Sequence, residues 1–308
     1  MLSPADLAAA PIWVHARGQL SLAVPRVMAV VNLTPDSFFD GGNLLAPGAD
    51  EANAGMAVRH CRGLAQQGAD ILDLGGESTR PGSTPVVAEL ELRRVLPVLR
   101  RLRDDPELAA VPISVDTRHA EVAEAAMAAG AAIINDISGL ADPAMAEVAA
   151  RTGAGLVLGH LRGEPATMQT HVCFTDLLAE VARELVAAVE RALRAGVPGD
   201  RILVDPGIGF GKTAEQSTAL LAASVELTQR TGCPVLIGAS RKAFLGVITG
   251  KAVGERLIGS VAAAVIAVER GASVVRVHDV AATAEALRVL AAVRAAERSI
   301  LRGARDAG

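Results

Sequence analysis

Eight short apolar runs, rich in β-branched residues, alternate along the chain with alanine- and leucine-rich stretches of helical length. Several of those stretches end in glycine, where a left-handed helix C-cap would lie. Parallel strands must be joined by long crossovers, so this alternation predicts parallel βα units. The expected strands are residues 26–32, 70–75, 112–116, 131–136, 155–160, 201–205, 234–238 and 273–279.

Eight strand and helix pairs favour an α/β fold, the (β/α)8 or TIM barrel, which occupies about 250 residues as one domain. The alternative is a doubly wound open sheet, but its dinucleotide-binding sequence G-x-G-x-x-G does not follow the first strand. We therefore predict a single barrel over residues 26–303. Residues 1–25 would form a short N-terminal extension that caps the closed end, and residues 304–308 a flexible tail.

Composition narrows the class of partner. Of 308 residues, 51% are hydrophobic and 21% are charged, which is typical of a soluble protein with a large core. The net charge is −4, so no basic excess indicates binding to nucleic acid or to an anionic membrane. The first residues do not resemble a secretion signal, and no apolar run is long enough to span a bilayer. We expect a cytoplasmic protein whose partners are small molecules.

The run DPGIGFGKT, residues 205–213, ends in Gly-Lys-Thr and superficially matches a phosphate-binding P-loop. A P-loop requires G-x-x-x-x-G-K-[ST], and the position of its first glycine is held here by Pro206. Proline has no amide hydrogen to donate to a phosphate. Asp205 and Lys212 therefore need another explanation.

Polar residues stand at the last position of the expected strands or just beyond it. The carboxyl ends of barrel strands meet on one face, where catalysis takes place in such barrels, so this pattern predicts an active site. Any single residue could instead cap the following helix, but that explanation is improbable for the whole set. The set is Asn32, Glu77, Asp116, Asn135, His160, Asp205, Ser240, Arg276 and His278.

The residue types in this set indicate two kinds of ligand group. Asp116, Asn135 and Asp205 can accept hydrogen bonds from the NH2 and ring N–H groups of a flat heterocycle, while a lysine donates to its carbonyl. Three other members of the set suit an anion, and phosphate is favoured because the arginine fork matches its oxygens. Those residues are Asn32, Arg276 and His278.

Lysine is rare in this chain. Of 30 basic residues only Lys212, Lys242 and Lys251 are lysines, and the first two follow strand ends closely. A compact ammonium is suited to a position where a guanidinium would not fit. Lys251 lies in an ordinary loop before a helix, so the lysine positions give weak support to the predicted site.

Seven segments, in order and from the first strand to the last, resemble dihydropteroate synthase. That family joins 6-hydroxymethyl-7,8-dihydropterin diphosphate to p-aminobenzoate, releasing pyrophosphate and forming 7,8-dihydropteroate for folate synthesis. The segments are VVNLTPDSFFDGG (30–42), GGESTRPGS (75–83), SVDT (114–117), NDISG (135–139), DPGIGFGK (205–212), SRKAFLG (240–246) and RVHDV (276–280).

The resemblance implies roles for individual residues. The pterin would be bound by Asp116, Asn135, Asp205, Lys242 and Arg276, with the arginine stacked over the ring. The diphosphate would be held by Asn32, Arg276 and His278, with Mg2+ near Asn32 and Asp36. Catalytic roles are implied for Asp116, Asp205, Lys242 and Asp36.

Two loops of the family, here TPDSFFDGG and ESTRPGS, close over the active site and form the p-aminobenzoate pocket. The implied pocket residues are Phe38, Thr79, Arg80 and Pro81 from these loops, with Phe210 and Ser240 from the facing loops. The family is commonly dimeric, so a homodimer is expected. The resemblance also implies that the protein is a target of sulfonamides.

The set of polar residues at the strand ends contains no nucleophile paired with a general base, and the family's chemistry explains why. The aniline nitrogen of p-aminobenzoate is itself the nucleophile, and the diphosphate leaves first. The enzyme's task would then be to stabilise separating charges.

Two departures from the family pattern concern the pocket walls. The family usually has Met-His-Met after the fifth strand, whereas this chain has Gly159, His160 and Leu161. Phe39 stands where a serine is usual. The first change would loosen the pterin pocket and the second would alter loop closure. Neither removes a charged participant, so activity is expected.

Two other functions remain open from the residues alone. A pterin-binding methyltransferase barrel shares the pterin pocket, but it would not need the SRK and TRPGS segments. A non-catalytic paralogue could bind pterin without turnover, although the intact diphosphate and loop residues argue against it.

Overall fold

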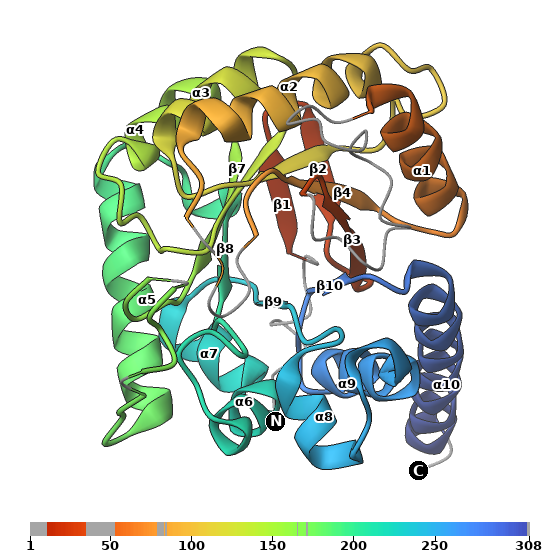
Figure 1. Cartoon of the computed structure of the whole chain (residues 1–308). Coiled ribbons are helices and arrows are strands. Elements are labelled where there is room, and N and C mark those ends of the chain that lie inside the picture. The colour runs from red at the N-terminus through yellow and green to blue at the C-terminus, as the bar shows by residue number, and fades with distance from the viewer. Residues whose placement is uncertain are drawn as a thin grey trace.

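The computed structural model describes residues 11–34, 53–78, 83, 85–164, 166–170 and 172–306. Its centre is a sheet of eight parallel strands with helices around the outside, as Figure 1 shows. The strands are β3 (Arg26–Asn32), β4 (Ile71–Gly75), β5 (Ile113–Asp116), β6 (Ile133–Asp136), β7 (Gly155–Gly159), β8 (Ile202–Asp205), β9 (Leu236–Ile237) and β10 (Val274–Val277).

The helices alternate with these strands. They are α1 (Ala54–Gln66), α2 (Ala88–Arg103), α3 (Ala120–Ala128), α4 (Met145–Thr152), α5 (Leu177–Arg194), α6 (Ala214–Leu221), α7 (Ser224–Thr231), α8 (Ala243–Thr249), α9 (Leu257–Glu269) and α10 (Val280–Asp306). Two helices, rather than the one expected, lie between β8 and β9 and again between β9 and β10. None of the helices in the described ranges is long and apolar enough to cross a membrane.

The strand order is β8-β7-β6-β5-β4-β3-β10-β9, so each strand lies beside its sequence neighbours and β10 beside β3. A parallel bridge between Val204 and Val235 joins the two ends of this order and closes the ring. The backbone N–H of Val204 donates to Pro234 over 3.0 Å at the same place. The structure therefore confirms the predicted TIM barrel, with every expected strand present and most of them shorter at the ends.

An antiparallel hairpin, β1 (Ile12–His15) and β2 (Gly18–Ser21), precedes the barrel. Trp13 in this hairpin is fully buried, and its indole Nε1 donates to the carbonyl of Arg201, immediately before β8, over 2.9 Å. Trp13 packs with side chains inside the barrel, including Met28, Ile71, Ile133, Val157, Leu203 and Val274. The hairpin thus covers the amino-terminal end of the strands and leaves the carboxyl-end face to the site. The domain limits at residues 25 and 303 stay predictions.

Candidate active site

The polar residues expected to ring one face do stand at the carboxyl ends of the strands. Asp116 and Asp205 are the last residues of β5 and β8, and Asn135 is the last but one residue of β6. These three side chains are buried, with exposed fractions of 7%, 8% and 3% respectively. Three strand ends therefore place a buried polar group at the carboxyl end of an otherwise apolar barrel.

Arg276 of β10 forms the centre of this face. Its Nε donates to Oδ2 of Asp73 over 2.6 Å, and its Nη2 donates to Oδ2 of Asp116 over 2.6 Å. The Nδ2 of Asn135 donates to the same Oδ2 of Asp73 over 3.1 Å. One arginine thus connects β10 with β4 and β5. Asp73 accepts hydrogen bonds from both Arg276 and the side-chain amide of Asn135.

Asp73 is a site residue that the sequence analysis missed. It lies within β4 rather than at its end, and it is fully buried. A signal was present, because a carboxylate inside an otherwise apolar strand requires a buried cation or hydrogen-bond donor.

Two buried carboxylate oxygens at this face, Oδ1 of Asp73 and Oδ1 of Asp116, have no hydrogen-bond partner among the described residues. Leaving a buried acceptor unpaired costs about 1–3 kcal/mol. Burial raises the pKa of Asp116 to about 7, although Arg276 opposes this shift. Burial also raises the pKa of Asp205, against the neighbouring Lys242. Such acceptors suit a buried ligand that carries N–H groups.

Lys242 is the N-cap residue of α8 and approaches the loop between β8 and α6. Its Nζ donates to the carbonyl of Ile208 and lies 3.9 Å from the centre of the Phe210 ring. Burial lowers the pKa of Lys242 to about 8, with Asp205 as the main opposing charge. Gly209 has a φ of +78°, and a Cβ there would lie 3.0 Å from Cδ of Lys242, so a larger residue at this position would strain the backbone and press on this lysine.

Ser240 and His278 form a second contact on this face. The backbone N–H of His278 lies 3.2 Å from Oγ of Ser240, and its Nδ1 lies 3.1 Å from the same oxygen. Between Ser240 and Lys242, Arg241 has a φ of +59°. Its Nε donates to Oδ2 of Asp279 over 2.9 Å, which holds the strained turn in place. The SRK segment is therefore a fixed turn that presents residues from both of its ends.

Two members of the predicted ring have other partners. Glu77 accepts from Nε and Nη2 of Arg118 over 2.9 and 3.1 Å. The ligand atoms of Glu77, Glu91 and His119 lie within 4.8 Å of one another, close enough for a metal ion. The Arg118 fork already occupies both oxygens of Glu77, so we interpret this cluster as an ion-pair network. His160 contacts Glu184 and Lys212 rather than the central carboxylates.

Asn32 is half-buried at the end of β3, whose neighbour in the ring is β10. Phe210 lies in the β8–α6 loop beneath Lys242. The other predicted residues lie outside the described residues; they are Asp36, Phe38, Thr79, Arg80 and Pro81, together with Phe39. The ligand-binding roles of all these residues stay predictions.

The barrel and its polar face define an enzyme of the pterin-binding class, and residues 28–278 match the family described as pterin binding enzyme. The dihydropteroate synthase of Neisseria meningitidis serogroup B is 46% identical over 283 residues, covering 90% of this chain and 96% of that protein. The Xanthomonas albilineans dihydropteroate synthase with 4-aminobenzoic acid is 45% identical, with a TM-score of 0.83 and coverage of 93% and 99%.

A third relative is the Burkholderia cenocepacia dihydropteroate synthase complexed with 7,8-dihydropteroate. It is 41% identical to this chain, with a TM-score of 0.81 and coverage of 94% of this chain and 98% of that one. The chain belongs to the dihydropteroate synthase family, and its activity is that of a transferase.

Proposed function

We propose that the carboxyl-end face of this barrel condenses 6-hydroxymethyl-7,8-dihydropterin diphosphate with p-aminobenzoate, and that the pterin ring binds between Asp116 and Asp205. The observation that carries this proposal is the unpaired, buried Oδ1 of Asp116, a carboxylate whose other oxygen accepts from Arg276. The pterin supplies the missing donors through its amino group and ring N–H. Asn135 and Lys242 border the same space, the first as a donor or acceptor and the second as a donor to the ring carbonyl.

Arg276 would exchange one carboxylate partner for the ligand. Its Nη2 contacts Asp116, whereas its Nε contacts Asp73, so a ligand that claims Asp116 frees one side of the guanidinium. The planar fork then stacks on the pterin and hydrogen-bonds phosphate oxygens. His278, two residues beyond Arg276, and Asn32, at the end of the neighbouring strand β3, would complete the diphosphate site.

The proposed site also takes Mg2+, and its first ligand, Asn32, stands at the end of β3. Magnesium prefers oxygen ligands, and the amide oxygen of Asn32 with the carboxylate of Asp36 provides them. We propose these two residues as its ligands. A bound Mg2+ supplies charge neutralisation for the departing diphosphate.

The reaction needs no protein nucleophile. The C–O bond to the diphosphate breaks, pyrophosphate departs with the electron pair, and the amine nitrogen of p-aminobenzoate forms the new bond and releases one proton to solvent. The carboxylates of Asp116 and Asp205 would stabilise the positive charge that develops on the pterin methylene. The proposed p-aminobenzoate pocket comprises Phe38, Thr79, Arg80, Pro81, Phe210 and Ser240.

A homodimer is proposed from the surface of α8, α9 and α10, which lie together in Figure 1. Large apolar side chains are exposed on all three helices: Val247 (73%), Ile248 (60%), Ile258 (83%) and Val289 (62%). A dimer interface over these helices would bury such side chains. Light scattering should give twice the 31.5 kDa chain mass for the wild type and a monomer for Ile258→Glu.

The activity is tested by following pyrophosphate release and dihydropteroate formation from the two substrates, with Mg2+ and after chelation. Asp116→Asn and Lys242→Met should lose product formation, whereas Asp104→Asn and Lys251→Met, at exposed positions, should retain it. If the wild type binds the pterin substrate but forms no product, the proposed function is wrong.

A further inference from the structure

Lys212, at the end of the DPGIGFGK segment, is a buried lysine that the proposed chemistry does not use. Only 4% of this residue is exposed. Its Nζ donates to the carbonyl of Phe210 over 2.9 Å and to Nδ1 of His160 over 3.0 Å. The ammonium therefore ties the β8–α6 loop to the residue that follows β7.

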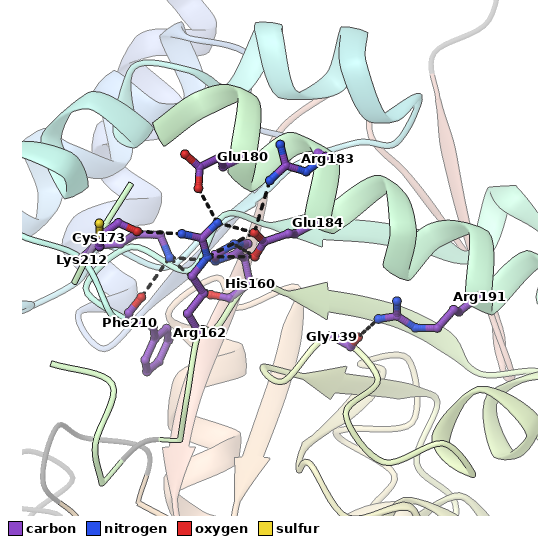
Figure 2. A network of polar contacts seen from close by, with 10 residues as sticks. All are labelled: Gly139, His160, Arg162, Cys173, Glu180, Arg183, Glu184, Arg191, Phe210 and Lys212. Atoms are coloured by element: carbon purple, nitrogen blue, oxygen red, sulfur yellow. Dashed lines mark hydrogen bonds and ion pairs between the residues drawn. The ribbon is translucent and has the colours of Figure 1, made fainter. Parts of the chain in front are cut away.

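His160 is held in turn from α5. Its Nε2 lies 2.9 Å from Oε2 of Glu184, as Figure 2 shows. Because Nδ1 accepts from Lys212, the neutral imidazole carries its proton on Nε2 and donates it to Glu184. Burial and the nearby Lys212 lower the pKa of His160 to about 4, which keeps the ring neutral and this tautomer in place.

Arg162 fixes the outer end of the same network. It donates to both oxygens of Glu184, and its Nη2 donates to Oε2 of Glu180 over 2.7 Å. Its Nη1 donates to the carbonyl of Cys173 over 2.7 Å, and its guanidinium lies 4.0 Å from the centre of the Phe174 ring. Figure 2 shows Glu184 in contact with both Arg162 and His160, so α5 supports Lys212 through Glu184 and His160.

The loop that Lys212 binds is rich in glycine, and it also contacts Lys242. Gly207, Gly209 and Gly211 all have positive φ values, which glycine adopts readily but at the largest cost in chain entropy. The same loop carries two groups that contact Lys242, namely the carbonyl of Ile208 and the ring of Phe210. A shift of this loop would therefore displace Lys242.

We propose that Lys212 is a positioning residue of the pterin site: through the carbonyl of Phe210 it fixes the β8–α6 loop, and through that loop it places Lys242 and the Phe210 ring. The network of His160, Glu184 and Arg162 extends this support to α5. The inference rests on the proposed function, because it assigns Lys242 and Phe210 to substrate binding. Lys212 itself contacts no reacting atom in this scheme.

The test compares Lys212→Met with Lys251→Met, an exposed lysine, in the full chain. We expect Lys212→Met to raise the KM for the pterin diphosphate and to lower kcat/KM about tenfold or more, since small misplacements of binding groups have effects of this size. Lys251→Met should match the wild type. A purely structural loss would reduce the amount of active enzyme, and so the apparent kcat, while leaving KM unchanged.

Glu184→Gln provides a second variant, which leaves Lys212 in place and weakens the contacts of residue 184 with His160 and Arg162. It should change the same KM in the same direction by a smaller factor, and it decides the question if Lys212→Met does not fold. An unchanged KM in every folded variant, with an active wild type, overturns the positioning role alone. An inactive wild type would instead overturn the proposed function.

Discussion

Arg276 and Asp116 form an ion pair in which Nη2 donates to Oδ2 over 2.6 Å, and the same guanidinium donates to Asp73. The carboxylate proposed to bind the pterin is therefore shared with the arginine proposed to stack on it. Asp73, fully buried within β4, is the partner that Arg276 can keep while Asp116 binds a ligand. The distribution of Arg276 between these two carboxylates should set the affinity for the pterin substrate.

Asp73→Asn should raise the KM for the pterin diphosphate about tenfold, because a hydrogen bond to a charged group contributes about 1.5–3 kcal/mol. The asparagine holds Arg276 less strongly, so the arginine competes better for Asp116. Asp70→Asn is the matched control, since Asp70 pairs with Arg26 at the opposite end of the strands. Steady-state kinetics with both variants check this. An equal KM for Asp73→Asn and wild type would contradict the anchoring role.

Gly209→Ala should impair the pterin site through a direct contact. The new Cβ would lie 3.0 Å from Cδ of Lys242, and we expect kcat/KM to fall about tenfold. Gly232→Ala is a close control, because Gly232 has a similar φ of +72° and nothing within 4 Å of its Cβ. Both variants should lose about 1–2 kcal/mol of folding free energy from the left-handed backbone. If kcat/KM falls in both variants, the cause is backbone strain rather than the contact with Lys242.

Glu77→Gln should weaken p-aminobenzoate binding. Oε1 of Glu77 accepts from the backbone N–H of Val86 over 3.0 Å while Arg118 holds the carboxylate, so Glu77 joins the two ends of the segment that includes residues 79–81. The amide keeps only part of these bonds, and the KM for p-aminobenzoate should rise about threefold to tenfold. Glu124→Gln, in an exposed pair with Arg151, should change nothing measurable. The prediction is wrong if the two variants behave alike.

The barrel was predictable from the sequence because periodicity and length determine it: eight apolar runs of strand length cannot be paired in parallel without the helices between them. The division into α6 and α7 was not predictable, since only two alanines separate these helices and no proline or glycine marks the break. β9 is shorter than expected because Pro234 has no N–H to donate to the ladder.

The polar ends of the strands predicted which residues meet on one face, as for Asp116, Asn135 and Asp205. Sequence order says less about which side chains pair within that face. Asp73 was missed because it lies inside β4 rather than at a strand end. Glu77 and His160 were predicted to belong to the polar set, although their side chains pair with Arg118 and Glu184. Such pairings depend on side-chain directions across neighbouring elements, which no linear pattern encodes.

The pH dependence of stability provides a separate test of the environment of Lys212. Burial lowers the pKa of Lys212 from 10.5 to about 7 in the folded chain. Asp205 and Glu184 oppose this shift, whereas Lys242 and Arg162 reinforce it, and neutral His160 accepts a hydrogen bond from the amine. Between these two pKa values the unfolded chain binds more protons at this lysine than the folded chain does.

The contribution of Lys212 to the free energy of unfolding should therefore rise with pH from about 7 to about 10.5 and be constant below that window. Denaturant unfolding of wild type and Lys212→Met at pH 6 to 9.5 should show the wild type gaining stability relative to the variant above pH 7. Lys251→Met should differ from wild type by a constant amount across the same range. A constant difference for Lys212→Met as well would mean that Lys212 is not desolvated, and that the loop binds a solvated lysine.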